Sequence, residues 1–337
     1  RDRRRHCSGY CLILESPPNI PFQSLAQSMV LLLLLSPAKA LSSSGLKSVP
    51  ARLTSPVLPA QHASVLRNAR ALTQAQIKSL MSISDDLASL NHQRYAAWDK
   101  AQTMACGGAF DGPAFKAMNL KDMDKKHIEA AQERVRVLSG LYGVLKPYDE
   151  IKPYRLEMGT KLDVNGTNKT LADYWRPHVV QALNDEFRAA PKGAQKILVN
   201  AASQEYAAAV DFDALSSDVE VVTCEFKTNA SVYAKQARGG ICRFCVTEQV
   251  ETIDGLRGFT GDEGEWKFTG EREEPLSKGS QRIQRILSFE RGATAPKNKG
   301  NKKAKAPEAA GAGAGAQQEE DEPAKKRART GSQKSKK

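Results

Sequence analysis

The sequence lacks an apolar run that could cross a lipid bilayer. A membrane-spanning helix needs about 20 consecutive apolar residues, whereas the apolar stretch Val30–Leu35 contains six. That length is also short for the hydrophobic core of a signal peptide. A short, uninterrupted apolar run is typical of a strand that is buried on both faces. We therefore expect a buried strand here and no membrane partner.

Cysteine and histidine are scarce. The 337 residues include six cysteines and five histidines, which is too few cysteines for a disulfide framework in a chain of this length. Cys242 and Cys245 form one CxxC motif with no second pair or histidine nearby, and a structural zinc site needs a complete set of such ligands. We therefore predict reduced, buried thiols in a cytoplasmic or nuclear protein, with no metal ion bound.

Positive charge is abundant but unevenly distributed. The formal net charge is +12, of which +7 lies in residues 293–337 and +2 in residues 1–28, leaving +3 for residues 29–292. Alternating Ala and Gly and runs of like charge cannot bury a core, so residues 293–337 are predicted to be a disordered, basic, low-complexity tail. Its cluster Lys325–Arg329 has the composition of a nuclear import signal, or of a generic solvated tail.

The first 28 residues show no periodic pattern, and we leave them unassigned. The chain begins with Arg1 rather than Met, so we interpret the N-terminus as incomplete and leave organelle targeting open. Cytoplasmic localisation, with import into the nucleus through the basic tail, is the expectation.

Helix and strand patterns alternate between residues 29 and 292. Helical periodicity covers residues 73–90, 124–139, 172–189 and 230–248, and strand-like patterns cover residues 30–35, 197–199, 219–226 and 256–268. Within the first helical stretch, Ser84 is placed to cap a second helix. This alternation predicts a mixed α/β (α+β) fold, in which helices surround a β core within one compact domain.

Several segments resemble the YaaA peroxide-stress family in the right order. They are LLSPAK (34–39), LTQAQIKSLMSISDDLASLN (72–91), AFDGPAFKAM (109–118), LSGLYGVLKPYDEIKPYRLEMG (138–159), LVNAASQEY (198–206) and SVYAKQARGGICRF (231–244). The block at 138–159 is the most specific, because 22 residues of matching order are very unlikely to arise by chance. Together the segments define a YaaA-like domain over residues 29–292.

The resemblance implies a function as well as a fold. It implies a compact α/β domain that binds DNA through a helix-hairpin-helix element and a positively lined channel. It also implies a role in limiting unincorporated iron, and so oxidative DNA damage, under peroxide stress. No cofactor is associated with that role.

Gly140 and Gly143 are candidates for the turn of the helix-hairpin-helix. In such a motif, backbone N–H groups at a glycine-containing turn bind a DNA phosphate without reading the bases. Apolar residues flank the two glycines, and Lys146 follows closely enough to add a charge. The alternatives are an ordinary helix end followed by a packed turn, or a motif in the helix pair at 73–90.

Arg155 and Glu157 alternate on one face if their segment is extended. The planar guanidinium of Arg155 suits a phosphate or a carboxylate. The alternative is a buried structural pair between these two side chains.

Polar residues follow two predicted core strands. Ser36 and Lys39 come after the first strand. The strand at 197–199 is followed by Asn200, Ser203, Gln204, Glu205 and Tyr206. Open α/β sheets place ligands at the carboxyl ends of their strands. Ser203 could cap the following helix and leave amides for an anion. The alternative is that all of these residues are caps and loop anchors.

The helix at 230–248 carries Lys235, Arg238 and Arg243 within an arc of about 140°. Such a cationic face beside Gly239 and Gly240 suits close approach to a phosphate backbone, and the alternative is a solvated charged face. These patterns, with the resemblance, predict sequence-independent binding of double-stranded DNA. The alternative function is an enzyme acting on a nucleotide or another phosphorylated small molecule, in a pocket lined by Lys39, Arg155, Asn200, Ser203, Tyr206, Lys235 and Arg238.

Overall fold

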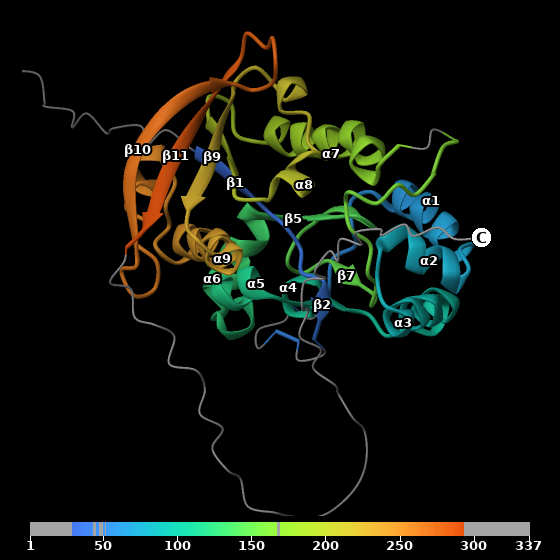
Figure 1. Ribbon diagram of the computed structural model, residues 1–337. Helices are drawn as coiled ribbons and strands as arrows, with labels where there is room; N and C mark the ends of the chain where they lie inside the picture. Colours follow the sequence, from blue (N-terminus) through green and yellow to red (C-terminus); the bar gives the residue numbers. More distant parts are fainter. Residues whose placement is uncertain (1–28, 43–44, 47–49, 51, 167–168, 293–337) are drawn as a thin grey trace, which may run out of the picture. The chain divides into compact units, whose positions relative to one another are not determined.

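The computed structural model describes residues 29–42, 45, 46, 50, 52–166 and 169–292. The predictions for residues 1–28 and for the tail at 293–337, including the import cluster, lie outside the described residues. The predicted mixed α/β class is confirmed, with one seven-stranded sheet and helices packed around it (Figure 1).

The main sheet has five parallel strands and an antiparallel strand at each edge. Its order is β10-β11-β9-β8-β1-β5-β6. The parallel strands are β11 (Ile283–Arg291), β9 (Val219–Lys227), β8 (Gln195–Asn200), β1 (Met29–Leu35) and β5 (Val135–Ser139), and the edge strands are β10 (Trp266–Pro275) and β6 (Gly143–Leu145). Two small antiparallel pairs join β2 (Ala40–Leu41) to β4 (Phe110–Asp111) and β3 (Met104–Ala105) to β7 (Glu150–Ile151).

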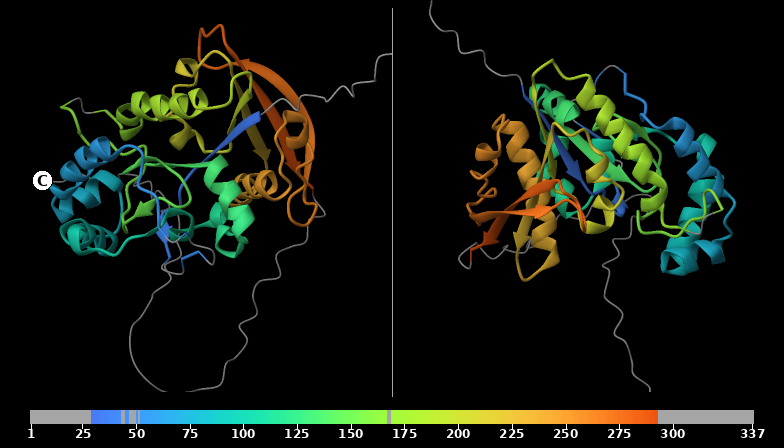
Figure 2. Two further views of the ribbon diagram at one scale, coloured as in Figure 1. Left: turned by 180° about the vertical axis from the view of Figure 1, so that it is seen from behind. Right: turned by 90° about the horizontal axis from the view of Figure 1, so that it is seen from above.

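Strand β1 lies in the middle of the core, as its uninterrupted apolar run predicts. Residues Leu31–Leu35 are all buried, because the strand pairs with β8 on one side and β5 on the other. Helices α6 (Lys125–Arg134) and α9 (Ser231–Thr247) pack against β1. Helix α7 (Leu171–Arg188) lies on the opposite side of that strand (Figure 2). Both faces of the strand are therefore shielded from water.

The remaining helices connect these layers. They are α1 (Pro59–Arg70), α2 (Gln74–Met81), α3 (Asp85–Ala96), α4 (Cys106–Ala109), α5 (Pro113–Met118), α8 (Gln204–Ala207) and α10 (Ile253–Leu256). As predicted, Ser84 caps α3 by accepting a hydrogen bond from the backbone of Leu87. None of the described helices combines the length and apolarity that a bilayer span requires.

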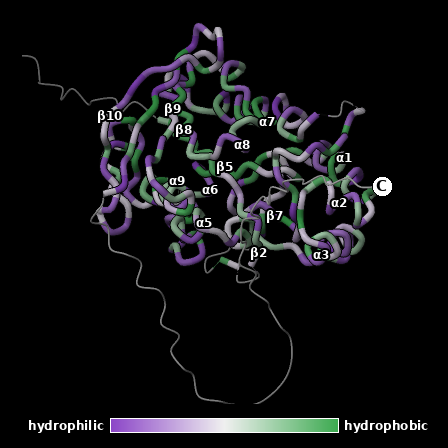
Figure 3. Tube along the Cα trace, viewed as in Figure 1, coloured by the Kyte–Doolittle hydropathy of each residue, from purple (hydrophilic) through white to green (hydrophobic). Residues whose placement is uncertain are grey.

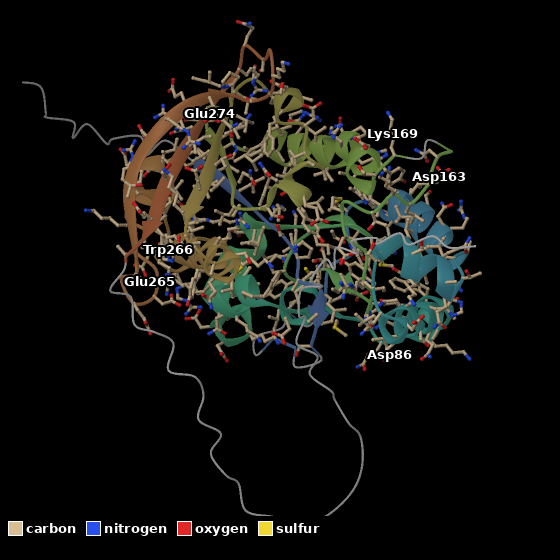
Figure 4. The ribbon with its side chains drawn as sticks, in the orientation of Figure 1. Asp86, Asp163, Lys169, Glu265, Trp266 and Glu274 are labelled. Carbon is tan, nitrogen blue, oxygen red and sulfur yellow. The ribbon has the colours of Figure 1, made fainter. Side chains whose placement is uncertain are left out.

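Hydrophobic residues concentrate along the central strands, whereas β10 is largely hydrophilic (Figure 3). Charged side chains such as Asp86, Lys169 and Glu274 project from the periphery (Figure 4). The separation of apolar core and charged surface is that of a protein whose main sheet is covered by its own helices.

The predicted helix at 124–139 was wrong at its C-terminal end. Helix α6 stops at Arg134, and Val135–Ser139 form strand β5. Val135 and Val137 are β-branched and fully buried, which favours a strand between neighbours. The pairing of β5 with β1 outweighs the helical periodicity that continues through this segment. The predicted strand at 256–268 also begins late, because β10 starts at Trp266.

The predicted helix-hairpin-helix turn at Gly140 and Gly143 is a β-hairpin instead. It joins β5 to β6, with Ser139 opposite Gly143. Gly143 has a φ of +78°, and a Cβ atom there would lie 2.6 Å from the ring of Trp175. Its glycine is therefore explained by backbone conformation and packing. The rival location does hold two helices, α2 and α3, joined by a short turn, and DNA binding by that pair stays a prediction.

Candidate functional site

A cavity of about 320 Å³ lies beyond the carboxyl ends of β1 and β8. From β1 the chain crosses to β5 on one side, whereas β8 leads to β9 on the other. This divergence is a topological switch point, where open α/β sheets bind ligands. The lining residues are Leu35, Ser36, Pro37, Ala38, Lys39, Ala40, Asp111, Gly112, Pro113, Ala114, Ser203, Glu205, Tyr206, Lys235 and Arg238.

Two serines tie the strand ends together at the base of this cavity. The backbone N–H of Ser203 donates to Oγ of Ser36 over 2.9 Å, and the two hydroxyl oxygens lie 3.2 Å apart. The backbone of Ala201 donates to the carbonyl of Leu34 over 3.0 Å. The predicted capping of α8 by the Ser203 side chain was wrong, because that hydroxyl forms no cap bond and faces Ser36 instead.

Asn200 and Tyr206 differ in what they do at this edge. Asn200 does not line the cavity: its Oδ1 accepts from the backbone of Ala202 over 3.0 Å, so it is a loop anchor. Tyr206 does line the cavity. Burial, followed by the nearby charges of Glu205 and Glu157, raises the pKa of Tyr206 far above its ordinary value. Its phenol is therefore neutral and can serve as a hydrogen-bond donor.

Helix α9 brings two cations to the cavity because it packs very closely on α5. A Cβ atom at Gly239 would lie only 1.8 Å from the carbonyl oxygen of Ala114. Only glycine leaves room for this contact, although glycine weakens a helix by about 1 kcal/mol relative to alanine. The contact holds Lys235 and Arg238 beside Pro113 and Ala114 at the cavity wall.

Arg238 is incompletely hydrogen-bonded inside this wall. Its Nε is buried and has no hydrogen-bond partner among the described residues. Burial lowers the pKa of Arg238, yet an arginine stays protonated at neutral pH. Lys235 is exposed, and within the described chain neither cation forms an ion pair with a carboxylate. Both charges are therefore available to an anion from outside.

Lys39 and Arg155 share one carboxylate, Glu157. Arg155 Nε lies 3.1 Å from Glu157 Oε1, and the two side chains are 12% and 15% exposed. The structural alternative for Arg155 is thus the observed arrangement, and Arg155 does not line the cavity. Lys39 Nζ lies 3.7 Å from the same oxygen, but its side chain is 61% exposed. Lys39 can therefore turn toward a ligand at low cost.

Three further predicted residues lie away from the cavity. Arg243 donates to the carbonyl of Met118 over 3.2 Å, which fastens α9 to the end of α5. Lys146 pairs with Glu186 at 3.2 Å. The carbonyl of Gly140 accepts from Trp175 Nε1 over 2.8 Å. The structure therefore unites Lys39, Ser203, Lys235 and Arg238, and it separates Gly140, Gly143, Lys146, Arg155 and Arg243 from them.

Sequence reasoning missed the part of the cavity wall that is formed by Asp111–Ala114, whereas it did place Glu205 among the polar residues after the strand at 197–199. Asp111 lies 3.5 Å from Lys116, and Glu205 accepts from the backbone N–H of Gly159 over 3.2 Å. The Asp-Gly-Pro turn at 111–113 was the available signal. A Cβ atom at Gly112 would lie 2.8 Å from Cβ of Ala38, so this turn must touch the loop after β1.

Among the described residues, no group of three His, Cys, Asp or Glu side chains is arranged to hold a metal ion. Cys242 and Cys245 lie fully buried in α9, and burial raises the pKa of both thiols. Core packing accounts for their positions.

The fold and the cavity together define an open-sheet α/β protein with a cavity lined by cations at its topological switch point. The chain belongs to the peroxide stress protein YaaA family, whose sequence pattern matches residues 31–272. A UPF0246 protein of Caulobacter vibrioides (strain NA1000 / CB15N) is 40% identical over 242 residues, covering 69% of this chain and 92% of that protein. A UPF0246 protein of Phenylobacterium zucineum is 39% identical over 250 residues, covering 72% and 91%. One from Burkholderia mallei (strain SAVP1) is 38% identical over 243 residues, covering 69% and 92%.

Proposed function

We propose that this protein acts in the peroxide-stress response by binding double-stranded DNA through phosphate contacts at the mouth of the switch-point cavity. The observation that carries the proposal is the convergence of Lys39, Lys235 and Arg238, which come from two separate elements of the chain, on one concave surface. In the proposed role, DNA binding helps to limit iron-driven oxidative damage.

Electrostatics support phosphate contacts at the mouth. Lys39 and Lys235 are exposed there, so their ammonium groups can reach a phosphate without leaving solvent. Each phosphate that a cation neutralises releases condensed counterions, which makes affinity fall steeply with salt. Contacts to phosphate fix a protein on the duplex but read no sequence. We therefore expect binding that depends on salt and not on sequence.

The test is a titration of the full chain with duplex DNA at several salt concentrations. Lys235→Ala should weaken binding to all sequences and reduce the salt slope by about 1. Lys267→Ala, at an exposed position on β10, is the matched control because it changes the net charge equally and leaves the cavity intact. The basic tail is the same in every variant, so it cannot produce a difference between them. Equal losses in both variants would refute a site at the cavity.

The cellular role can be tested separately. A bacterium that lacks its own family member would express either the full chain or Lys235→Ala, followed by challenge with hydrogen peroxide. Survival and unincorporated iron, measured by electron paramagnetic resonance, should be restored by the wild-type chain and less by the variant. Restoration by both proteins to the same degree would separate stress protection from this site.

A further inference from the structure

The interior of the cavity differs from its mouth. Lys39 and Lys235 are exposed, whereas Nε of Arg238 is buried. A volume of about 320 Å³ lies at the lower end of the range for small-molecule sites, which is about 300–1,000 Å³. A DNA duplex is far too wide to enter such a space. A ligand of the interior must therefore be smaller than the duplex that the mouth is proposed to contact.

The walls of the interior are largely apolar. Leu35, Pro37 and Ala38 form one wall after β1, and Pro113 and Ala114 form another at the start of α5. Leu35 is fully buried, and both prolines restrict their backbone. Rigid apolar walls with a few polar groups are typical of sites that enclose an uncharged ring system.

The polar groups that line the cavity have both signs. Arg238 lines the cavity and has no ion-pair partner among the described residues, and a guanidinium can bind a phosphate through two parallel hydrogen bonds. Glu205 and the neutral phenol of Tyr206 lie in the same lining. A carboxylate accepts hydrogen bonds from hydroxyl or amino groups. The ligand should therefore combine an anion, an apolar ring and hydrogen-bond donors.

We propose that the cavity binds one nucleoside monophosphate unit, with its phosphate on Arg238 and its sugar and base between the apolar walls. This proposal rests on the phosphate-binding function proposed above and specifies the unit that the interior takes. The same chemistry is presented by a free nucleotide and by one unstacked nucleotide of a DNA strand.

Isothermal titration calorimetry of the full chain with deoxyadenosine monophosphate tests the proposal. Arg238→Met should weaken this binding at least about tenfold, because it removes a charged hydrogen bond. Arg188→Met, on the exposed surface of α7, is the matched control and should bind as the wild type does. Circular dichroism of each variant establishes that the fold is retained. Inorganic phosphate should bind more weakly than the nucleotide, because it leaves the apolar walls uncovered.

Two results would overturn the proposal: no saturable binding of the nucleotide by the wild type, or binding no tighter than that of inorganic phosphate. Both can occur while duplex binding through Lys235 persists, so failure here is distinct from failure of the proposed function. The reverse pattern, nucleotide binding without duplex binding, supports the cavity proposal and refutes the proposal that the mouth binds duplex DNA. Competition by a single-stranded oligonucleotide identifies a DNA strand as the source, and lack of competition identifies a free nucleotide.

Discussion

Two arginines of this protein, one in the core and one in the cavity wall, differ in how their positive charge is paired. Arg136 on β5 is 2% exposed, and its Nε donates to Glu186 over 2.8 Å. Its other nitrogens donate to the same carboxylate and to backbone carbonyls. Arg238 on α9 has a buried Nε without a partner among the described residues.

The difference separates a structural charge from an available one. Burial alone would raise the pKa of Glu186, but hydrogen bonds and attraction from Arg136, with attraction from Lys146, outweigh burial and lower it. Arg136 is thus permanently paired with the carboxylate of Glu186. Among the described residues, no carboxylate pairs with Arg238, although an unsatisfied buried donor costs about 1–3 kcal/mol. A cost of that kind is typical of a ligand site, where the partner comes from outside.

The largest effect is expected where the buried pair is broken. Glu186→Ala leaves the charge of Arg136 buried and unpaired, which should lower the free energy of unfolding by about 3–5 kcal/mol. The measurement is chemical denaturation at neutral pH. The adjacent Asp185→Ala is the control, because its pair with Arg188 is exposed and should contribute at most about 1 kcal/mol.

The same pair should have a characteristic pH dependence. Because the pKa of Glu186 is lowered in the folded state, its contribution is fully present above the unfolded pKa, about 4.3. That contribution is lost as pH falls through the lowered folded pKa. The stability difference between wild type and Glu186→Ala should therefore shrink on acidification. A difference that stays constant would contradict the assignment of the effect to this ion pair.

A smaller loss of stability is expected from a substitution at the contact between α5 and α9, which forms part of the cavity wall. Gly239→Ala gains about 1 kcal/mol of helix propensity, but its Cβ collides with the carbonyl of Ala114. We expect a net loss of about 1–3 kcal/mol as α9 shifts, together with weaker ligand binding because Arg238 moves with that helix. Gly240→Ala is the control, since its Cβ would meet only the ring tip of Phe259 at 3.2 Å. Equal losses of stability in Gly239→Ala and Gly240→Ala would show that the close contact between α5 and α9 does not require glycine at position 239.

The smallest effect on stability is expected at the cavity cation itself. Arg238→Met removes an unsatisfied donor and keeps an apolar stem, so the free energy of unfolding should stay level or rise by up to about 1 kcal/mol. Arg243 lies outside the cavity lining and donates to the carbonyl of Met118. Arg243→Met should therefore lower the free energy of unfolding. Thermal unfolding of both variants without ligand makes the comparison. A marked loss of stability in Arg238→Met would mean that this arginine serves the fold.

Local patterns predicted the core strands at 30–35, 197–199 and 219–226 well. The first two are apolar runs, and the third has the partly alternating pattern of a strand. Local patterns also placed Ser36, Lys39 and Ser203 correctly at strand ends. They failed at Val135–Ser139, which continues a helical periodicity and becomes a strand only because β1 offers it a partner. They failed at Gly140 and Gly143 for a similar reason, since a glycine-containing turn looks alike between helices and between strands.

Hydrophobic runs and ordered motifs along the chain were enough to predict the fold class, the family and the burial of the strand at 30–35. Which cations line the same cavity became clear only from the packed fold. Arg155, Arg238 and Arg243 carry the same charge, and the sequence treats them alike. Arg155 contacts Glu157, Arg243 contacts a backbone carbonyl, and Arg238 lines a cavity. The last two surroundings are formed by segments far apart in the chain, which only tertiary packing brings together.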